Sequence, residues 1–294
     1  MTDSLISLHP HEIDDDAIQD RTSETLTQQA FDTAAPVYDQ TYEQLHGIRR
    51  LRRLISQVYD RYFAPGQHLL ELNCGTGTDA IEQARKGVHV LATDVSPAMI
   101  HEVKRKLRDA RLEHMITPRV LSYHDLHLLK GSIFDGAYSN MGGLNCTAEM
   151  GEIARHLAGL IRPGGYFIAT VMTDFCLWET AAFLSRLQIR NALRRRKRGG
   201  VSAHLHGGTV QTYYYSPDMF ASHFAPYFER IQLTGLNILT PPPNSTRVYD
   251  RFPDFVWALE GIDDKISGLP VFSAIGDHFL MVLRRKQTGG TVAS

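Results

Sequence analysis

The sequence predicts an α/β fold in which a mostly parallel sheet is covered by helices on both faces. Short apolar runs, which we expect to be strands, alternate with segments of helical character between residues 68 and 172. The first run leads into a glycine-rich turn, and the second run stops at Asp94. The chain has 294 residues, of which 43% are hydrophobic, so it can form a large core.

The N-terminal part is expected to carry two helices, over residues 26–46 and 48–62. Leu51, Ile55 and Val58 share one stripe of the second helix, and the arginines at 49, 50, 52 and 53 are expected to form its solvated face. Residues 1–25 hold seven acids and one base, so we expect a mobile acidic tail without a signal peptide. The strands are then expected at 68–73, 88–93, 117–122, 133–139 and 165–172.

The pattern changes after residue 172. We expect a helix over 176–198 that ends in a basic run, then a hairpin over 201–215 that turns at Gly207 and Gly208. Ser216 followed by proline predicts the start of another helix. Further strands are expected at 228–240 and 277–285, with a helix near 252–266 between them. Residues 26–294 are thus expected to form a single domain with insertions at about 173–214 and 241–273.

The glycine-rich turn is the strongest functional signal. The pattern Gly75-x-Gly77-x-x-Ala80 fits a dinucleotide fingerprint, with an acid, Asp94, 19 positions after Gly75. Two further acids, Glu71 and Asp79, would repel a pyrophosphate and would suit a ligand that brings a cation to the turn. An NAD-dependent dehydrogenase is therefore an alternative that these acids disfavour.

The chain resembles the class I S-adenosylmethionine-dependent methyltransferases in five segments that follow the order of that family. They are Glu71-Leu-Asn-Cys-Gly-Thr-Gly77, Asp94-Val-Ser-Pro-Ala-Met99, Tyr123-His124-Asp125-Leu126, Phe134-Asp-Gly-Ala-Tyr-Ser-Asn140 and Leu160-Ile-Arg-Pro-Gly-Gly-Tyr166. Upstream, Phe31-Asp-x-x-Ala-x-x-Tyr38-Asp39 resembles the helix that closes over the methionine end in many members. The sequence departs from the family at Asn73, where glycine is common.

The resemblance implies a seven-stranded Rossmann-like sheet whose last strand is antiparallel, with the insertions packed as a lid over the strand ends. It also implies S-adenosyl-L-methionine as the cofactor, with Asp94 on the ribose and the Asp125 segment on the adenine. The cofactor-binding residues expected on this basis are Tyr38, Glu71, Asn73, Gly75, Gly77, Asp79, Asp94, Val95, Met99, His124, Asp125, Leu126, Ser139 and Asn140.

The expected reaction is transfer of a methyl group by in-line displacement to an O, N or C atom of a small-molecule acceptor, for which an anionic compound is one option. Asn140 and His206 are the candidate catalytic residues. Candidate acceptor contacts are Trp178, Glu179, His204 and Tyr214. An RNA methyltransferase and a non-catalytic protein that binds S-adenosylmethionine remain alternatives.

The composition limits the remaining possibilities. Three widely spaced cysteines favour reduced thiols in the cytoplasm over a disulfide framework or a metal site. The net charge of −1 and the lack of a long apolar run lead us to expect no membrane partner and no general attraction to nucleic acid. The basic run Arg194–Arg198 fits a solvated helix end, an anionic small substrate or RNA.

Overall fold

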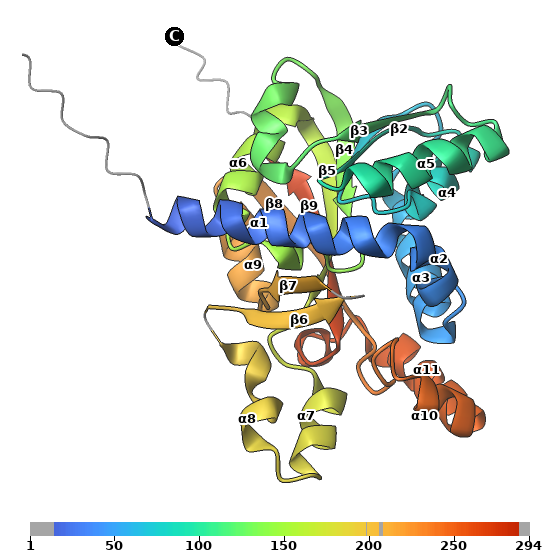
Figure 1. Ribbon diagram of the computed structural model, residues 1–294, viewed down its shortest axis with the longest axis vertical. Coiled ribbons are helices and arrows are strands. Elements are labelled where there is room, and N and C mark those ends of the chain that lie inside the picture. The colour runs from blue at the N-terminus through green and yellow to red at the C-terminus, as the bar shows by residue number, and fades with distance from the viewer. Residues whose placement is uncertain (1–14, 198, 206–207, 288–294) are drawn as a thin grey trace, which may run out of the picture.

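The computed structural model describes residues 15–197, 199–205 and 208–287. Its centre is a seven-stranded sheet with the strand order β3-β2-β1-β4-β5-β9-β8 (Figure 1). Neighbouring strands are parallel except at β9, which runs antiparallel to both β5 and β8. The expected fold class, including the antiparallel last strand, is confirmed.

The strands lie close to their expected positions. They are β1 (His68–Leu72), β2 (His89–Asp94), β3 (Ile116–Val120), β4 (Phe134–Ser139), β5 (Ile161–Met172), β8 (Phe228–Leu236) and β9 (His278–Arg285). Strand β5 begins earlier than expected because Ile161 pairs with Phe134 before the register shifts. The central strands are buried on both faces, which explains their nearly continuous apolar sequence.

Two helical layers cover the sheet. Helices α3 (His46–Tyr62), α4 (Thr78–Arg85) and α5 (Pro97–Ala110) pack on one face, and α6 (Met150–Leu160), α9 (Pro217–Phe224) and the 3-10 segment η2 (Tyr123–Leu129) pack on the other. Successive side chains of a strand point to opposite faces, so Leu70 and Leu72 join the α6 layer while Leu69 joins the α3 layer. As expected, Ser216 caps α9 by accepting a 3.1 Å hydrogen bond from the Met219 amide.

The first helix of the structure is longer than expected. Helix α1 spans Asp15–Ala34 and crosses the molecule in front of the sheet (Figure 1). The expectation of a mobile tail over 1–25 is therefore wrong from residue 15 onward, while residues 1–14 lie outside the described residues. Short helical segments η1 (Ala35–Val37) and α2 (Tyr38–Tyr42) then lead into α3.

The region after β5 is broken into short elements. It contains α7 (Leu177–Leu184), α8 (Ile189–Ala192), η4 (Arg194–Arg196), and a hairpin of β6 (Val201–Leu205) and β7 (Gly208–Thr212). The single helix expected over 176–198 is wrong, because Leu187 adopts a φ of 57° and ends the helical path. The second insertion contains α10 (Thr246–Arg251), α11 (Pro253–Ile266) and η5 (Phe272–Ala274).

Only part of the inserted structure reaches the strand ends. The β6–β7 hairpin packs against α1 so closely that a Cβ on Gly208 would lie 2.5 Å from the Cβ of Ala30. Helices α7 and α8, and helices α10 and α11, extend away from the sheet instead (Figure 1). That both insertions act as a lid stays a prediction.

Several arginines that the sequence placed on solvated faces are internal ion-pair partners. Arg50 is 4% exposed and pairs with Asp264 and Glu260. In the basic run, Arg195 is 7% exposed and donates to Glu179 at 2.8 Å and to Asp277 at 2.5 Å. Buried charges are tolerated when they are paired and hydrogen-bonded, which is the case at both places.

Arg195 stabilises the junction between β5, α7 and β9. Its guanidinium also donates to the backbone oxygens of Thr173 and Asp277, both at 3.2 Å, and stacks over the Tyr214 ring at 4.9 Å. Burial opposes ionisation of Asp277, but the charges of Arg195 and His278 outweigh it and lower the pKa of this carboxyl below its usual range.

We expect Arg195→Met to lower the free energy of unfolding by about 3–5 kcal/mol, because it leaves a buried carboxylate without its partner. The exposed neighbour Arg196 provides the matched control, and Arg196→Met should change stability by less than about 1 kcal/mol. Urea denaturation followed by circular dichroism measures both. Equal effects of the two substitutions would contradict the structural role of Arg195.

Candidate functional site

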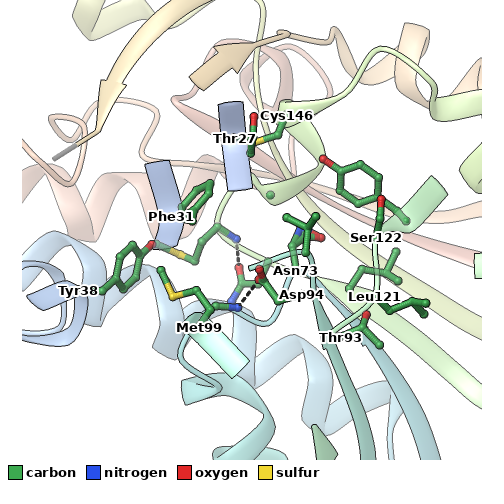
Figure 2. A pocket seen from close by; sticks show the side chains of 17 residues that line it. Thr27, Phe31, Tyr38, Asn73, Thr93, Asp94, Met99, Leu121, Ser122 and Cys146 are labelled. Atoms are coloured by element: carbon green, nitrogen blue, oxygen red, sulfur yellow. Dashed lines mark hydrogen bonds between the residues drawn. The ribbon is translucent and has the colours of Figure 1, made fainter. Parts of the chain in front are cut away.

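A cavity of about 650 Å³ lies at the carboxyl ends of β1, β2 and β4, beneath α1. Figure 2 shows Asp94 and Asn73 near its middle, Phe31 and Tyr38 on one side, and Leu121 and Ser122 on the other. Its lining residues are Thr27, Phe31, Tyr38, Leu72, Asn73, Gly75, Thr93, Asp94, Val95, Met99, Leu121, Ser122, Tyr123, Asn140, Met141, Gly143 and Cys146.

Asp94 links the two sides of this cavity. It is the last residue of β2, and its carboxylate accepts 2.9 Å hydrogen bonds from the amides of Gly75 and Ser96. Each carboxylate oxygen can accept a further hydrogen bond, so both can receive hydroxyl groups from a ligand. Burial raises the pKa of Asp94 to about 6, even though the two amides favour its ionised form.

The glycine-rich turn brings its backbone to the cavity through left-handed residues. Asn73, Gly75 and Gly77 have φ values of 47°, 54° and 76°. Glycine adopts this region without strain, and a residue without Cβ lets a ligand approach the backbone. At Gly77 a Cβ would also meet the Val103 side chain at 3.0 Å, so this glycine serves the packing of α4 against α5.

Asn73 occupies the space beside Gly143. Its Oδ1 accepts a 2.9 Å hydrogen bond from the Ser139 hydroxyl, while its buried Nδ2 has no partner among the described residues. A Cβ on Gly143 would lie 1.7 Å from that Nδ2. The asparagine in the turn is therefore accommodated only because position 143 is glycine.

Asp79 and Asn140 belong to a charge-balanced network behind the turn. Asp79 accepts 2.7 Å hydrogen bonds from Arg52 and from the Asn140 amide, and Arg52 also pairs with Glu43 at 2.9 Å. The Asn140 Oδ1 in turn accepts from the Met141 amide at 2.6 Å. Asn140 lines the cavity, yet both ends of its amide are used to hold the loop after β4.

The acids of the turn are less negative than the sequence suggested. Glu71 is 2% exposed and does not line the cavity, and burial together with repulsion by Asp79 raises its pKa well above the usual range. The charge of Asp79 is balanced by Arg52. The expectation that Glu71 and Asp79 present negative charge to a ligand is therefore wrong, and among the lining residues Asp94 is the only carboxylate.

Helix α1 closes the cavity and is held at two places. Asp32 accepts from the Ser96 hydroxyl at 2.5 Å and from the Ala98 amide at 3.1 Å, at the positive N-terminus of α5. Glu24 accepts from the Ser122 hydroxyl at 2.6 Å, just after β3. Between these contacts, Thr27 and Phe31 face the cavity (Figure 2).

The cofactor residues expected from the sequence divide into two groups. Tyr38, Asn73, Gly75, Asp94, Val95, Met99 and Asn140 line the cavity. Glu71, Gly77, Asp79, His124, Asp125, Leu126 and Ser139 do not. In the second group, the Nε2 of His124 lies 3.4 Å from the Oε2 of Glu24, so His124 helps to hold α1 in place. The Ser139 hydroxyl orients the Asn73 amide by donating a hydrogen bond to its Oδ1.

The expected acceptor residues do not line this cavity. His204 is exposed on β6, and Glu179 is used by Arg194 and Arg195. Tyr214 stacks beneath Arg195, and Trp178 is half-buried on α7. His206 lies outside the described residues. The lining instead includes Thr27 and Cys146, which the sequence analysis did not select.

The missed residues had weak signals. Thr27 and Phe31 are four residues apart and therefore share one face of α1, but the acidic surroundings hid that face. Cys146 ends the 3-10 segment η3 (Gly143–Cys146) and is held in place by Asn145, whose side chain donates to the oxygens of Met172 and Tyr213. These long-range contacts cannot be read from local sequence.

The described part of the chain offers neither a metal site nor a membrane-spanning helix. Over the part of the chain that the structure describes, no group of three or more His, Cys, Asp or Glu side chains is arranged to hold a metal ion. Within the same ranges, no helix combines the length and the apolar character needed to span a bilayer.

Comparison with known families identifies the central region. A family model described as "Methyltransferase domain" matches residues 69–165. A demethylmenaquinone methyltransferase of Symbiobacterium thermophilum is 26% identical over 149 residues, which are 49% of this chain and 58% of that protein. A ubiquinone biosynthesis O-methyltransferase of Xanthomonas campestris is 28% identical over 134 residues, which are 45% of this chain and 54% of that protein. The chain thus spans little more than half the length of these relatives.

Solved structures share the fold over most of the chain. The [4+2]-cyclase SpnF superposes with a TM-score of 0.60 at 16% identity, over 91% of this chain and 97% of that chain. A structure described as a putative sarcosine dimethylglycine methyltransferase from Galdieria sulphuraria superposes with a TM-score of 0.53 at 15% identity, over 82% and 86%. At these identities the likeness concerns the fold alone.

The fold and the site define a Rossmann-like protein that binds its ligand at the carboxyl ends of the strands, with an acid on β2 facing that ligand. The antiparallel β9 between β5 and β8 separates it from dinucleotide-binding folds with the order 3-2-1-4-5-6. The match over residues 69–165 shows that this central region is similar to the methyltransferase-domain family.

We expect the affinity for S-adenosylhomocysteine to depend on the ionisation of Asp94. Ribose hydroxyls donate to the carboxylate, so bound ligand favours the ionised form, and the free protein must lose a proton below its pKa of about 6. Affinity should be constant above that pH and should fall by up to about tenfold per unit below it. Calorimetry over this range measures the effect. Asp94→Asn should bind weakly and without this dependence, whereas an equally steep profile in the variant would contradict the assignment.

We expect Gly143→Ala to lower both stability and cofactor affinity, because its Cβ would overlap the Asn73 amide. Overpacking of this kind costs about 1–3 kcal/mol. The double variant Asn73→Gly/Gly143→Ala removes the overlap and should recover most of the stability. A double-mutant cycle by thermal denaturation and calorimetry gives the coupling, and additive effects would show that the two positions do not compete for space.

Proposed function

We propose that this chain transfers the methyl group of S-adenosyl-L-methionine to an O, N or C atom of a small-molecule acceptor. The observation that carries the proposal is the closure of the cavity by α1. Thr27 and Phe31 cover the cavity between two polar contacts of the same helix, at Glu24 and Asp32. An acceptor that reaches this enclosed space has to be small or has to present a narrow group.

The lining fits an adenosyl ligand. Asp94 retains capacity to accept hydrogen bonds from a ribose diol. Val95, Met99 and Leu121 offer apolar surface beside it for an adenine ring. Asn73 lies near Asp94 (Figure 2), and its Nδ2, which has no partner among the described residues, fits a ligand or acceptor atom that accepts a hydrogen bond. When bound, S-adenosylmethionine supplies a methyl carbon activated by its positive sulfur.

The lining favours alignment over proton transfer. It includes Tyr38 and Cys146 on different sides of the cavity (Figure 2), and burial raises the pKa of each of them to about 12. Both are therefore protonated at neutral pH and are poor general bases. In this proposal the chain holds the acceptor in line with the methyl group and excludes water, and the acceptor itself must be nucleophilic.

The named relatives support a small acceptor. The Symbiobacterium protein is described as acting on demethylmenaquinone, and the Xanthomonas protein belongs to ubiquinone biosynthesis. By analogy, a ring hydroxyl that has already lost its proton to water would react as the oxygen anion and would need no base from the protein. His206, which we selected from the sequence as a catalytic residue, lies outside the described residues and stays a candidate.

The RNA alternative lost part of its support. The basic run was its electrostatic footprint, but Arg195 is buried and Arg194 pairs with Glu179 at 2.6 Å, which leaves Arg196 and Lys197 exposed. A [4+2]-cyclase shares this fold, so the fold also occurs in an enzyme named for a reaction other than methyl transfer. Fold does not determine the reaction, so the transfer itself must be measured.

The test uses calorimetry and mass spectrometry. We expect S-adenosylhomocysteine to bind, NAD not to bind, and Asp94→Ala to lose binding of S-adenosylhomocysteine while the exposed-site control His204→Ala keeps it. Incubation with S-adenosylmethionine carrying a deuterated methyl group and a panel of catechols, hydroquinones and amines should then label one acceptor class. Binding of NAD in place of S-adenosylhomocysteine would contradict the assignment of S-adenosylmethionine as the cofactor. Cofactor binding without any labelled product would favour a non-catalytic role.

A further inference from the structure

The link between α7 and α8 forms a fully exposed apolar and basic tip. We call residues 184–191 the α7–α8 tip; every residue in it is exposed. Leu187 is 88% exposed and Ile189 is 63% exposed, and Leu184 and Leu193 flank them at 48% and 51%. Figure 1 shows α7 and α8 extending from the body of the molecule, on the side away from β3.

The backbone of the tip holds Leu187 outward at a position that suits glycine. Its φ is 57°, and the Gln188 amide donates to the oxygen of Phe183 at 2.9 Å, which is the pattern of a helix end closed by a left-handed residue. Glycine or asparagine is the usual residue there. A leucine that is both strained and solvated gains nothing within the monomer, so it indicates a partner.

The charge of the tip points to the kind of partner. Residues 180–197 contain no acid and six basic residues. Arg194 and Arg195 are used by Glu179, but Arg186, Arg190 and Lys197 are exposed and form no ion pair with any residue in the described ranges. Exposed aliphatic side chains among unpaired arginines match a surface that is anionic outside and apolar beneath.

We propose that the α7–α8 tip docks on the surface of an anionic lipid bilayer. Leu187 and Ile189 enter the boundary between headgroups and acyl chains, and Arg186 and Arg190 pair with lipid phosphates. This is contact from one side and requires no spanning helix. It revises our expectation of no membrane partner, which came from the net charge of the whole chain rather than from this local charge.

A protein partner fits the tip less well. A stable protein interface buries about 800 Å² on each partner, from about 20–30 residues, and the tip is a projection of only eight. Phe252 and Trp257, at the start and in the middle of the α11 region, are also exposed, at 55% and 62%. They offer a second copy of the chain as the competing occupant of the tip.

The experiment is sedimentation of the full chain with vesicles of phosphatidylcholine, with and without phosphatidylglycerol. We expect binding only to the anionic vesicles, and weaker binding at high salt. Ile189→Glu and Arg186→Glu/Arg190→Glu should each weaken binding by about tenfold or more. Ile133→Glu is the matched apolar control, because Ile133 is also 63% exposed, and Arg53→Glu/Arg119→Glu is the exposed basic control.

Circular dichroism and calorimetry with S-adenosylhomocysteine verify that each variant is folded, so a failure of the methyl-transfer proposal is recognised separately. The docking proposal is overturned if the wild-type chain does not bind anionic vesicles at low salt, or if the tip variants bind as well as their controls. It is equally overturned if size-exclusion chromatography shows a dimer that Ile189→Glu dissociates, since the tip is then an interface between copies.

Discussion

The site depends on one hydrogen-bonded junction, in which the Asp94 carboxylate accepts hydrogen bonds from the backbone amides of Gly75 and Ser96. This junction fixes the glycine turn after β1 relative to the end of β2 and the start of α5. The turn must leave its backbone amides facing the carboxylate, which explains the left-handed conformation at Gly75. The cost of burying the carboxylate is partly offset by the two amides, and its remaining acceptor positions face the cavity. A ligand that donates two hydroxyl groups therefore completes a set of hydrogen bonds that the protein leaves open.

The sequence predicted those features that depend on local pattern. Apolar runs located all seven strands of the sheet, and the turn with its partner acid located the cofactor end of the cavity, because both signals lie within short segments. A helix from residue 26 was predicted, but the start of α1 at Asp15 was not. The acidic start of this helix carries no wide apolar stripe, and its position depends on Glu24 and Asp32 meeting groups about 60 to 100 residues away in sequence.

Charge balance was the second feature beyond the reach of sequence. Counting acids near the turn suggested a negative rim, yet the carboxylate of Asp79 meets the guanidinium of Arg52, and burial raises the pKa of Glu71. The same holds for the basic run, where Arg195 is taken up by Glu179 and Asp277. In each case the sequence showed the charged residue, but it did not show the oppositely charged residue that pairs with it in the fold. The sequence therefore identifies where charged residues cluster. The net charge that a site presents to a ligand depends on which of these residues form ion pairs in the folded protein.

The pairing of Asn73 with Gly143 bears on the reaction itself. An asparagine in the turn is compatible with the loop after β4 only if position 143 lacks a Cβ, so the two positions constrain each other. The asparagine then carries a buried N–H donor without a partner among the described residues, and it lies near Asp94 in the middle of the cavity (Figure 2). An unsatisfied buried donor is costly unless a bound molecule accepts its hydrogen. Tyr38 and Cys146 remain protonated and supply no base, so in this proposal the acceptor reacts as an oxygen anion that has already lost its proton to water. Such an oxygen would also accept the hydrogen bond that the Asn73 amide offers.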